Sequence, residues 1–180
     1  MPNTIVMGIT SGVPATLLGS AFALATTRAV RGPIRTVLHY VALLPLIAPP
    51  FALALSTIFL FGRQGLLTRG LFGWETDPYG FSGLIFVQTI TFFPVAYLIF
   101  DSLVRQLDPA LEEAALNLGA SRARILRTVV IPLLRPGFAA GFLIIFVESL
   151  ADLAIPLLIG GDFNVLASSA YLSIIGEFDT

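Results

Sequence analysis

Residues 112–136 read EEAALNLGASRARILRTVVIPLLRP, a charged and helix-forming segment inside a chain that is otherwise apolar. Asp108 and Pro109 stand just before it and predict a helix start, because aspartate can cap free backbone amides and proline fits the first helical position. Gly119 predicts the end of that helix, since glycine readily takes the left-handed conformation that a sharp exit needs. A short first helix is therefore expected between Pro109 and Gly119.

A second helix is expected to follow, because Ser121 can cap its first turn and Ile131-Pro132 can close it. The first helix has small residues at the centre of one narrow apolar stripe, which consists of Leu111, Ala114, Ala115 and Leu118 at positions i, i+3, i+4 and i+7. Residues 105–135 are thus predicted to be a helix–turn–helix elbow that is too short and too charged to cross a bilayer.

The rest of the chain has the composition of a membrane protein. Hydrophobic residues make up 56% of the sequence and charged residues 12%, and the mean hydropathy is +0.91, values outside the usual range of soluble domains. Four apolar runs are long enough to span about 30 Å of hydrocarbon as helices: 5–27, 36–62, 79–104 and 137–160. We therefore expect an all-α, polytopic bundle of about four transmembrane helices.

Prolines lie in every expected span, and each removes a backbone hydrogen bond and is expected to interrupt and bend its helix. Taken together they favour bent helices around a cavity over a straight, tightly packed bundle. The prolines concerned are Pro14, Pro45, Pro49, Pro50, Pro94 and Pro156.

The placement of arginine predicts the orientation in the membrane. Arg28, Arg31 and Arg35 follow the first span, and five more arginines lie between the third and fourth spans. The positive-inside rule makes both groups cytoplasmic, which puts the N-terminus, the loop 63–78 and the tail 161–180 outside. The tail is too short and too interrupted to cross, so it is expected to lie at the interface or to begin a further helix.

Several classes of function are disfavoured by composition. The formal net charge of −1 gives no basic field for nucleic acid. The chain has no cysteine, which removes disulfides and thiolate chemistry. No GxxxxGK[ST] motif occurs, so the chain is not expected to hydrolyse ATP itself. His39 is the single histidine, and interfacial packing is its expected role; we predict no catalytic residue and no metal site.

Two acidic residues fall inside the fourth span. Glu148 and Asp152 are four residues apart and are expected to share one helical face. An ionised aspartate at mid-bilayer costs roughly 2.5–3.5 kcal/mol on insertion scales, so a partner, water or a proton is expected there. Three interpretations stay open: both acids line a translocation pathway for a cation, they are neutral or hydrogen-bonded groups that hold helices together, or the helix is shifted so that Asp152 nears the outer surface.

From the residues alone, the elbow could be a helix lying on lipid, a structural re-entry or a docking surface for a soluble partner. Its pattern closely resembles the EAA loop of binding-protein-dependent ABC importer permeases, through Glu113, Ala114 and Ala115, Gly119 six residues after the glutamate, and Val129, Ile131 and Pro132. Four longer stretches resemble the ferric-iron-type branch of these permeases: LLPLIAPPFALAL (43–55), FGRQGLLTR (61–69), FFPVAYLIFDSLVRQLDPALEEAA (92–115) and LADLAIPLLIGGDFNVLAS (150–168).

The resemblance implies a multi-pass protein of the bacterial inner membrane, in which this chain is part of a larger type I importer permease domain. It implies that the first elbow helix docks on a cytoplasmic ATPase subunit, with Glu113, Ala114, Ala115, Gly119 and Pro132 as coupling residues. The other implied partners are a second permease half, a periplasmic or lipid-anchored substrate-binding protein and membrane lipid. The chain itself would hold no cofactor, since ATP is bound by the partner subunit.

The cargo implied by the resemblance is ferric iron, and thiamine and polyamine permeases share enough of the pattern to be alternatives. An acidic position of the iron-type family also resembles Asp152. The buried acids and broken helices also fit two other classes of protein in part. An intramembrane hydrolase would use Glu148 and Asp152, but a carboxylate dyad normally joins two elements, and no GxSxG or HExxH motif is present. An ion-coupled secondary transporter or channel fits buried acids and broken helices, yet has no use for an ATPase-docking elbow.

Overall fold

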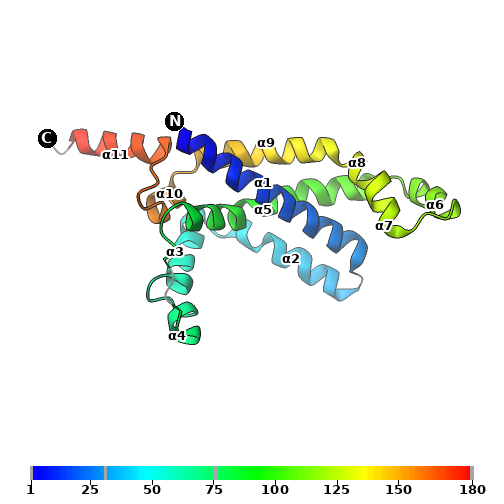
Figure 1. Ribbon diagram of the computed structural model, residues 1–180, viewed down its shortest axis with the longest axis horizontal. Coiled ribbons are helices and arrows are strands. Elements are labelled where there is room, and N and C mark those ends of the chain that lie inside the picture. The colour runs from blue at the N-terminus through cyan, green and yellow to red at the C-terminus, as the bar shows by residue number, and fades with distance from the viewer. Residues whose placement is uncertain (1, 31, 75–76, 179–180) are drawn as a thin grey trace.

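The computed structural model describes residues 2–30, 32–74 and 77–178. Every regular element within these ranges is a helix (Figure 1), and the predicted all-α membrane class is confirmed. Arg31, one of the arginines used to predict the orientation, and the last two residues of the tail lie outside the described part of the chain.

Three long helices form the body of the molecule: α1 (Pro2–Leu24), α5 (Phe81–Gln106) and α9 (Arg135–Ala151). α1 packs against both α5 and α9, and Figure 1 shows the three running along the long axis. Ala15, Tyr97 and Ile145, one from each helix, are fully buried in the same hydrophobic cluster. The core therefore lies along the line where the three helices meet.

Pro14 and Pro94 lie inside α1 and α5 without interrupting either helix. The expectation that every span is interrupted at its prolines is wrong for these two helices. A proline in a membrane helix removes one backbone hydrogen bond. Packing against neighbouring helices can keep the backbone helical on both sides of the proline. Pro94 is itself buried in the contact with the neighbouring helices.

Small residues on α1 allow close contact with both neighbours: Gly8 and Gly12 face α9, and Gly19 faces α5. The buried positions of α1 recur every three or four residues and include Gly8, Gly12 and Gly19, the spacing by which membrane helices bring their backbones together. A Cβ atom added at Gly19 would lie 2.6 Å from the Cβ of Ala96 and 2.6 Å from the backbone nitrogen of Tyr97. A larger residue at Gly19 would therefore push the two helices apart.

The segment expected as one span at 36–62 is two helices, α2 (Pro33–Ile47) and α3 (Pro50–Phe61), which meet at an angle of 103°. Ala48 between them is extended, at φ −78° and ψ 133°, because a residue that precedes proline is driven out of the helical region. Figure 1 shows α3 turned away from the long axis and followed by α4 (Thr68–Phe72) at its tip.

The segment expected as a fourth span is also broken. α9 ends at Ala151, a short helix α10 (Ala154–Ile159) follows, and the tail forms α11 (Leu166–Phe178). Within the described residues, two helical stretches are long and apolar enough to cross a membrane: Pro2–Ala29 and α5. The number of candidate spans rises to four if each of two bent helix pairs is counted as one span. The count of four crossings stays a prediction.

The elbow lies at the opposite end of the molecule from α11 (Figure 1). It consists of α6 (Pro109–Asn117), α7 (Arg122–Ile125), the π-helix η2 (Leu126–Val130) and α8 (Ile131–Leu133). A second π-helix, η1 (Ala25–Ala29), extends α1 toward the same end. The expectation that Ile131-Pro132 closes the second elbow helix agrees with the structure: the helical run Arg122–Leu133 ends one residue after Pro132, and α9 follows after a 57° bend.

Candidate functional site

The first elbow helix starts where the sequence predicts. Asp108 is its N-cap, and the carboxylate Oδ1 of Asp108 accepts a hydrogen bond of 2.9 Å from the amide of Ala110. Pro109 is the first helical residue, and Glu112 lies in the first turn, where a negative charge is favourable. These three local signals fix the start of α6 without help from the rest of the fold.

Gly119 makes the turn of the elbow. Its φ is +82°, a conformation that costs about 1–2 kcal/mol in residues with a Cβ atom. The amide of Ala120 donates to the carbonyl oxygen of Ala115 at 3.0 Å, which closes the helix end. After the turn, the hydroxyl of Ser121 accepts from the amide of Arg124 at 3.3 Å and caps α7, as predicted.

The two arms of the elbow differ in how they are packed. The second arm is anchored, since Ile125, Val130 and Leu134 are all at most 4% exposed in the same core cluster as Phe100. The first arm, α6, has no buried residue. Of its predicted apolar stripe only Ala115 packs against the core, while Leu111 and Leu118 stay exposed. The elbow therefore presents α6, a helix with an exposed face, on a second arm that is anchored in the core.

One ion pair connects α6 to the end of the first span. A guanidinium nitrogen of Arg28 in η1 lies 2.5 Å from a carboxylate oxygen of Glu112, and the two side chains are 25% and 32% exposed. Glu113, the next residue on α6, is exposed and has no ion pair in the described part of the chain. The five residues predicted to couple to an ATPase thus lie on one elbow, with Glu113, Ala114 and Gly119 exposed and Ala115 and Pro132 half-buried.

A second polar feature crosses the bundle interior. Gln88 on α5 donates from Nε2 to Oδ2 of Asp152 at 2.9 Å. The hydroxyl of Ser149 on α9 donates to Oε1 of Gln88 at 2.8 Å, and it lies 3.0 Å from the hydroxyl of Ser11 on α1. Ser11, Gln88 and Ser149 are fully buried and Asp152 is 8% exposed. We call these four residues the buried polar chain.

Asp152 also explains why the fourth segment breaks. Its Oδ1 accepts from the amides of Ala154 and Ile155, at 3.1 and 3.3 Å, and so caps the start of α10. A side-chain acceptor at a helix start satisfies amides that would otherwise be unpaired, a need that is acute away from water. The carboxylate of Asp152 thus has three donors around it.

Glu148 and Asp152 do not share a helical face, and that expectation is wrong. Asp152 is buried and lies beyond the last residue of α9, whereas Glu148 is exposed on the surface of that helix. The i to i+4 relation fails because the helix ends at Ala151. Whether either acid lines a translocation pathway stays a prediction.

Sequence reasoning missed Gln88, Ser149 and Ser11. The signal available for them was polarity inside an apolar run, because a polar side chain within a membrane span requires an internal partner. Which partners meet could not be found, since they come from helices that are up to 138 residues apart in sequence.

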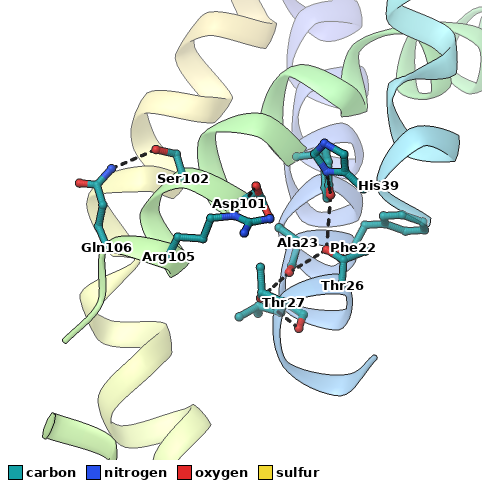
Figure 2. Close-up of polar contacts among 11 residues, drawn as sticks. Phe22, Ala23, Thr26, Thr27, His39, Asp101, Ser102, Arg105 and Gln106 are labelled. Atoms are coloured by element: carbon teal, nitrogen blue, oxygen red, sulfur yellow. Dashed lines mark hydrogen bonds and ion pairs between the residues drawn. The ribbon is translucent and has the colours of Figure 1, made fainter. Parts of the chain in front are cut away.

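His39 is half-buried on α2 and contacts α5 rather than lipid alone. Its Nδ1 lies 2.6 Å from the hydroxyl of Tyr97, and the hydroxyl of Thr26 approaches the same oxygen at 3.5 Å. Figure 2 shows this group beside the ion pair of Asp101 and Arg105, whose Nε–Oδ2 distance is 2.8 Å. Among the described residues, no three side chains of the metal-binding types gather at one place.

Long apolar helices, two bent helix pairs and an exposed helical elbow define a polytopic membrane protein. A family model for the inner membrane component of binding-protein-dependent transport systems matches residues 15–178. The chain belongs to this family of inner membrane proteins.

Several relatives have known names. The chain is 37% identical over 182 residues to the putative ferric transport system permease protein FbpB 1 of Haemophilus influenzae, and 36% identical to the ferric transport system permease protein FbpB of Actinobacillus pleuropneumoniae. Both matches cover 97% of this chain but only 28% and 26% of the relatives, so the chain spans about a quarter of their length. The molybdenum transport system permease protein ModB of Escherichia coli is 28% identical over 79% of this chain and 65% of its own.

A solved structure shares the fold. The inward-facing MetNI methionine ABC transporter matches 94% of this chain and 76% of its own chain, with a TM-score of 0.74 and 19% sequence identity. The arrangement of helices described above is therefore shared with a chain of this ABC transporter.

Proposed function

We propose that this chain is the translocating and coupling part of a permease in an ATP-driven, binding-protein-dependent importer, and that α6 docks on a separate ATPase subunit. The observation that carries the proposal is the elbow itself. α6 is a capped helix with no buried residue, held on an anchored second arm and tied to the first span through Glu112 and Arg28.

The geometry suits the transmission of movement. A displacement of α6 would reach the bundle by two routes: through Gly119 and the continuous helical arm of α7, η2 and α8 into α9, and through the Arg28–Glu112 ion pair into η1 and α1. Rigid elements shift together as bodies, with a few residues absorbing the change in dihedral angles. An ATPase that moves α6 could thereby rock α1 and α9 against α5.

Ferric iron is the cargo that the comparisons support best. The two relatives that match 97% of this chain are both named ferric transport permeases. The molybdenum permease of Escherichia coli matches less of the chain at lower identity. We propose the other parts of the importer on the same grounds: a cytoplasmic ATPase, a second permease half and a substrate-binding protein. ATP hydrolysis belongs to the ATPase, because the chain carries no GxxxxGK[ST] motif.

Replacement of Gly119 by valine tests the proposal in the complete transporter in proteoliposomes. A β-branched residue cannot readily hold φ +82°, so the elbow would open and ATP hydrolysis would no longer drive uptake. Gly73→Val is the matched control, because Gly73 has φ +67°, has equally open surroundings and lies in the loop after α4. Uptake lost in the Gly119 variant and kept in the Gly73 variant supports the proposal; normal ATP-driven uptake with Gly119→Val refutes it.

A further inference from the structure

A cleft of about 860 Å³ opens between the elbow and the nearby ends of three helices: α1 with η1, α2 and α5. Its wall includes residues of η1, the start of α2, the end of α5, and both α6 and α7. Four arginines line it: Arg28, Arg35, Arg105 and Arg122. The transport proposal uses one of these groups, the Arg28 side chain that pairs with Glu112, and leaves the rest of the cleft unexplained.

The positive charge of the cleft is only partly neutralised from within. Arg28 pairs with Glu112, and Arg105 pairs with Asp101. Figure 2 shows Arg105 turned back along α5 toward Asp101. In the part of the chain that the structure describes, Arg35 and Arg122 make no ion pair. Among the described residues, Glu113 is the one acid on the wall that makes no ion pair.

Arg28 also carries an unused donor. Its Nε atom is buried and finds no hydrogen-bond partner among the described residues, although the other end of the same guanidinium group is paired with Glu112. A buried N–H of a charged group without an acceptor is costly, more so than one of a neutral group. An acceptor with several oxygens in the cleft would pair with the guanidinium groups of Arg35 and Arg122, and it would reach Nε of Arg28 once that side chain turns.

The position of the cleft along the bundle points to the source of that acceptor. Arg28 follows α1, Arg35 lies in the first turns of α2 and Arg105 lies in the last turn of α5. Arginines at the ends of apolar helices mark the boundary between hydrocarbon and water. Lipid phosphates lie at that same level. The wall is also apolar between the arginines, through Leu24, Val104 and Leu126, which suits glycerol and acyl carbons but not a free ion.

We infer that this cleft binds the phosphate headgroup of an anionic phospholipid, with Arg28, Arg35 and Arg122 as its donors. Guanidinium groups bind phosphate oxygens through short, charge-assisted and often paired hydrogen bonds. Basic pockets between membrane helices at the headgroup level are a general mode of anionic lipid binding. A zwitterionic lipid carries a positive group in its own headgroup, so its binding is stabilised less by the unpaired guanidinium groups.

The test is native mass spectrometry of the detergent-purified chain titrated with phosphatidylglycerol, cardiolipin or phosphatidylcholine. The double variant Arg35→Gln with Arg122→Gln removes two cleft charges, and Arg124→Gln with Arg127→Gln removes two exposed arginines of the same elbow that do not line the cleft. We expect the first pair to weaken retention of anionic lipid at least about tenfold, and the second pair to weaken it less than about threefold.

A third variant keeps every charge. Ala123→Phe places a ring in the cleft from an exposed position on its wall, and it should also weaken lipid retention, which keeps the inference testable if the double variant misfolds. Equal losses in the two double variants would mean diffuse surface attraction and would overturn the inference. So would equal retention of phosphatidylcholine and phosphatidylglycerol by the wild-type chain. Displacement of the lipid by millimolar inorganic phosphate would assign the cleft to a free anion and overturn the lipid as its occupant.

Discussion

Gln88 and Asp152 are 64 residues apart in sequence and share a hydrogen bond of 2.9 Å in the interior of the bundle. Gln88 is fully buried and lies about two turns from the start of an unbroken helix, α5, whereas Asp152 lies in the gap between two helices. The amide of Gln88 thus holds in place the carboxylate that starts α10. Pro156 acts at the same break, because it lies four residues after Asp152 and cannot donate to the carbonyl of that residue.

Gln88→Leu is expected to destabilise the protein. Leucine fills a similar volume but leaves the buried Oδ2 of Asp152 without its donor, at about 1–3 kcal/mol, while the hydroxyl of Ser149 keeps only its contact with Ser11. Unfolding titrations in detergent micelles measure the loss. Gln106→Leu is the control, since Gln106 is exposed at the end of the same helix and should change stability by less than about 0.5 kcal/mol. Equal stability of the two variants would show that the buried polar chain contributes nothing.

Asp152→Asn separates a structural role of this residue from a pathway role. An asparagine oxygen can still accept from the amides of Ala154 and Ile155, and its NH₂ group can donate to Gln88 once the Gln88 amide turns over. The variant is therefore expected to fold. If the charge of Asp152 attracts a cationic substrate, removing it costs about 1 kcal/mol or more, which is at least about fivefold in transport affinity. Uptake kinetics in proteoliposomes measure this, and unchanged kinetics in a folded variant would remove Asp152 from the pathway.

The Arg28–Glu112 ion pair is expected to support coupling between α6 and α1. Arg28→Glu or Glu112→Arg alone brings like charges together and should lower ATP-driven uptake, while the exchanged double variant should recover much of it. Both side chains are partly exposed, so a coupling energy of only about 0.5–1 kcal/mol is expected in a double-mutant cycle on stability. If the exchanged pair transports no better than the single variants, the contact does not act as a link.

The loop between the second and third segments should have a pH-sensitive contact. Arg63 donates to Oδ2 of Asp77 at 2.7 and 3.1 Å, and this contact lowers the pKa of the Asp77 carboxyl below its ordinary value. A lowered pKa in the folded state means that the contact contributes fully above the ordinary pKa, about pH 4, and is lost as pH falls through the lowered value. Carbon-13 NMR of the labelled carboxyl follows the titration. Arg63→Gln should raise the midpoint, and an unchanged midpoint would show that Arg63 is not the cause.

Much of the elbow could be predicted because its signals act over a few residues. The cap at Asp108, the turn at Gly119 and the cap at Ser121 each depend on the geometry of one helix end, and all three are where the sequence placed them. Pro132 is a local signal of the same kind, because the helical run that begins at Arg122 ends at Leu133, one residue after this proline.

The membrane class and the elbow with its turn were determined by the sequence alone, because hydropathy and helix-end chemistry depend on residue type and short spacing. The tertiary structure decided which groups face one another: Gln88 with Asp152, Arg28 with Glu112, and the arginines around the cleft. It also decided that Glu148 and Asp152 lie in different environments, since the helix ends between them and the side chains beyond the break no longer follow the helical spacing. Such pairings depend on how separate helices pack, and the packing is fixed by small residues such as Gly19 that carry no pairing signal of their own.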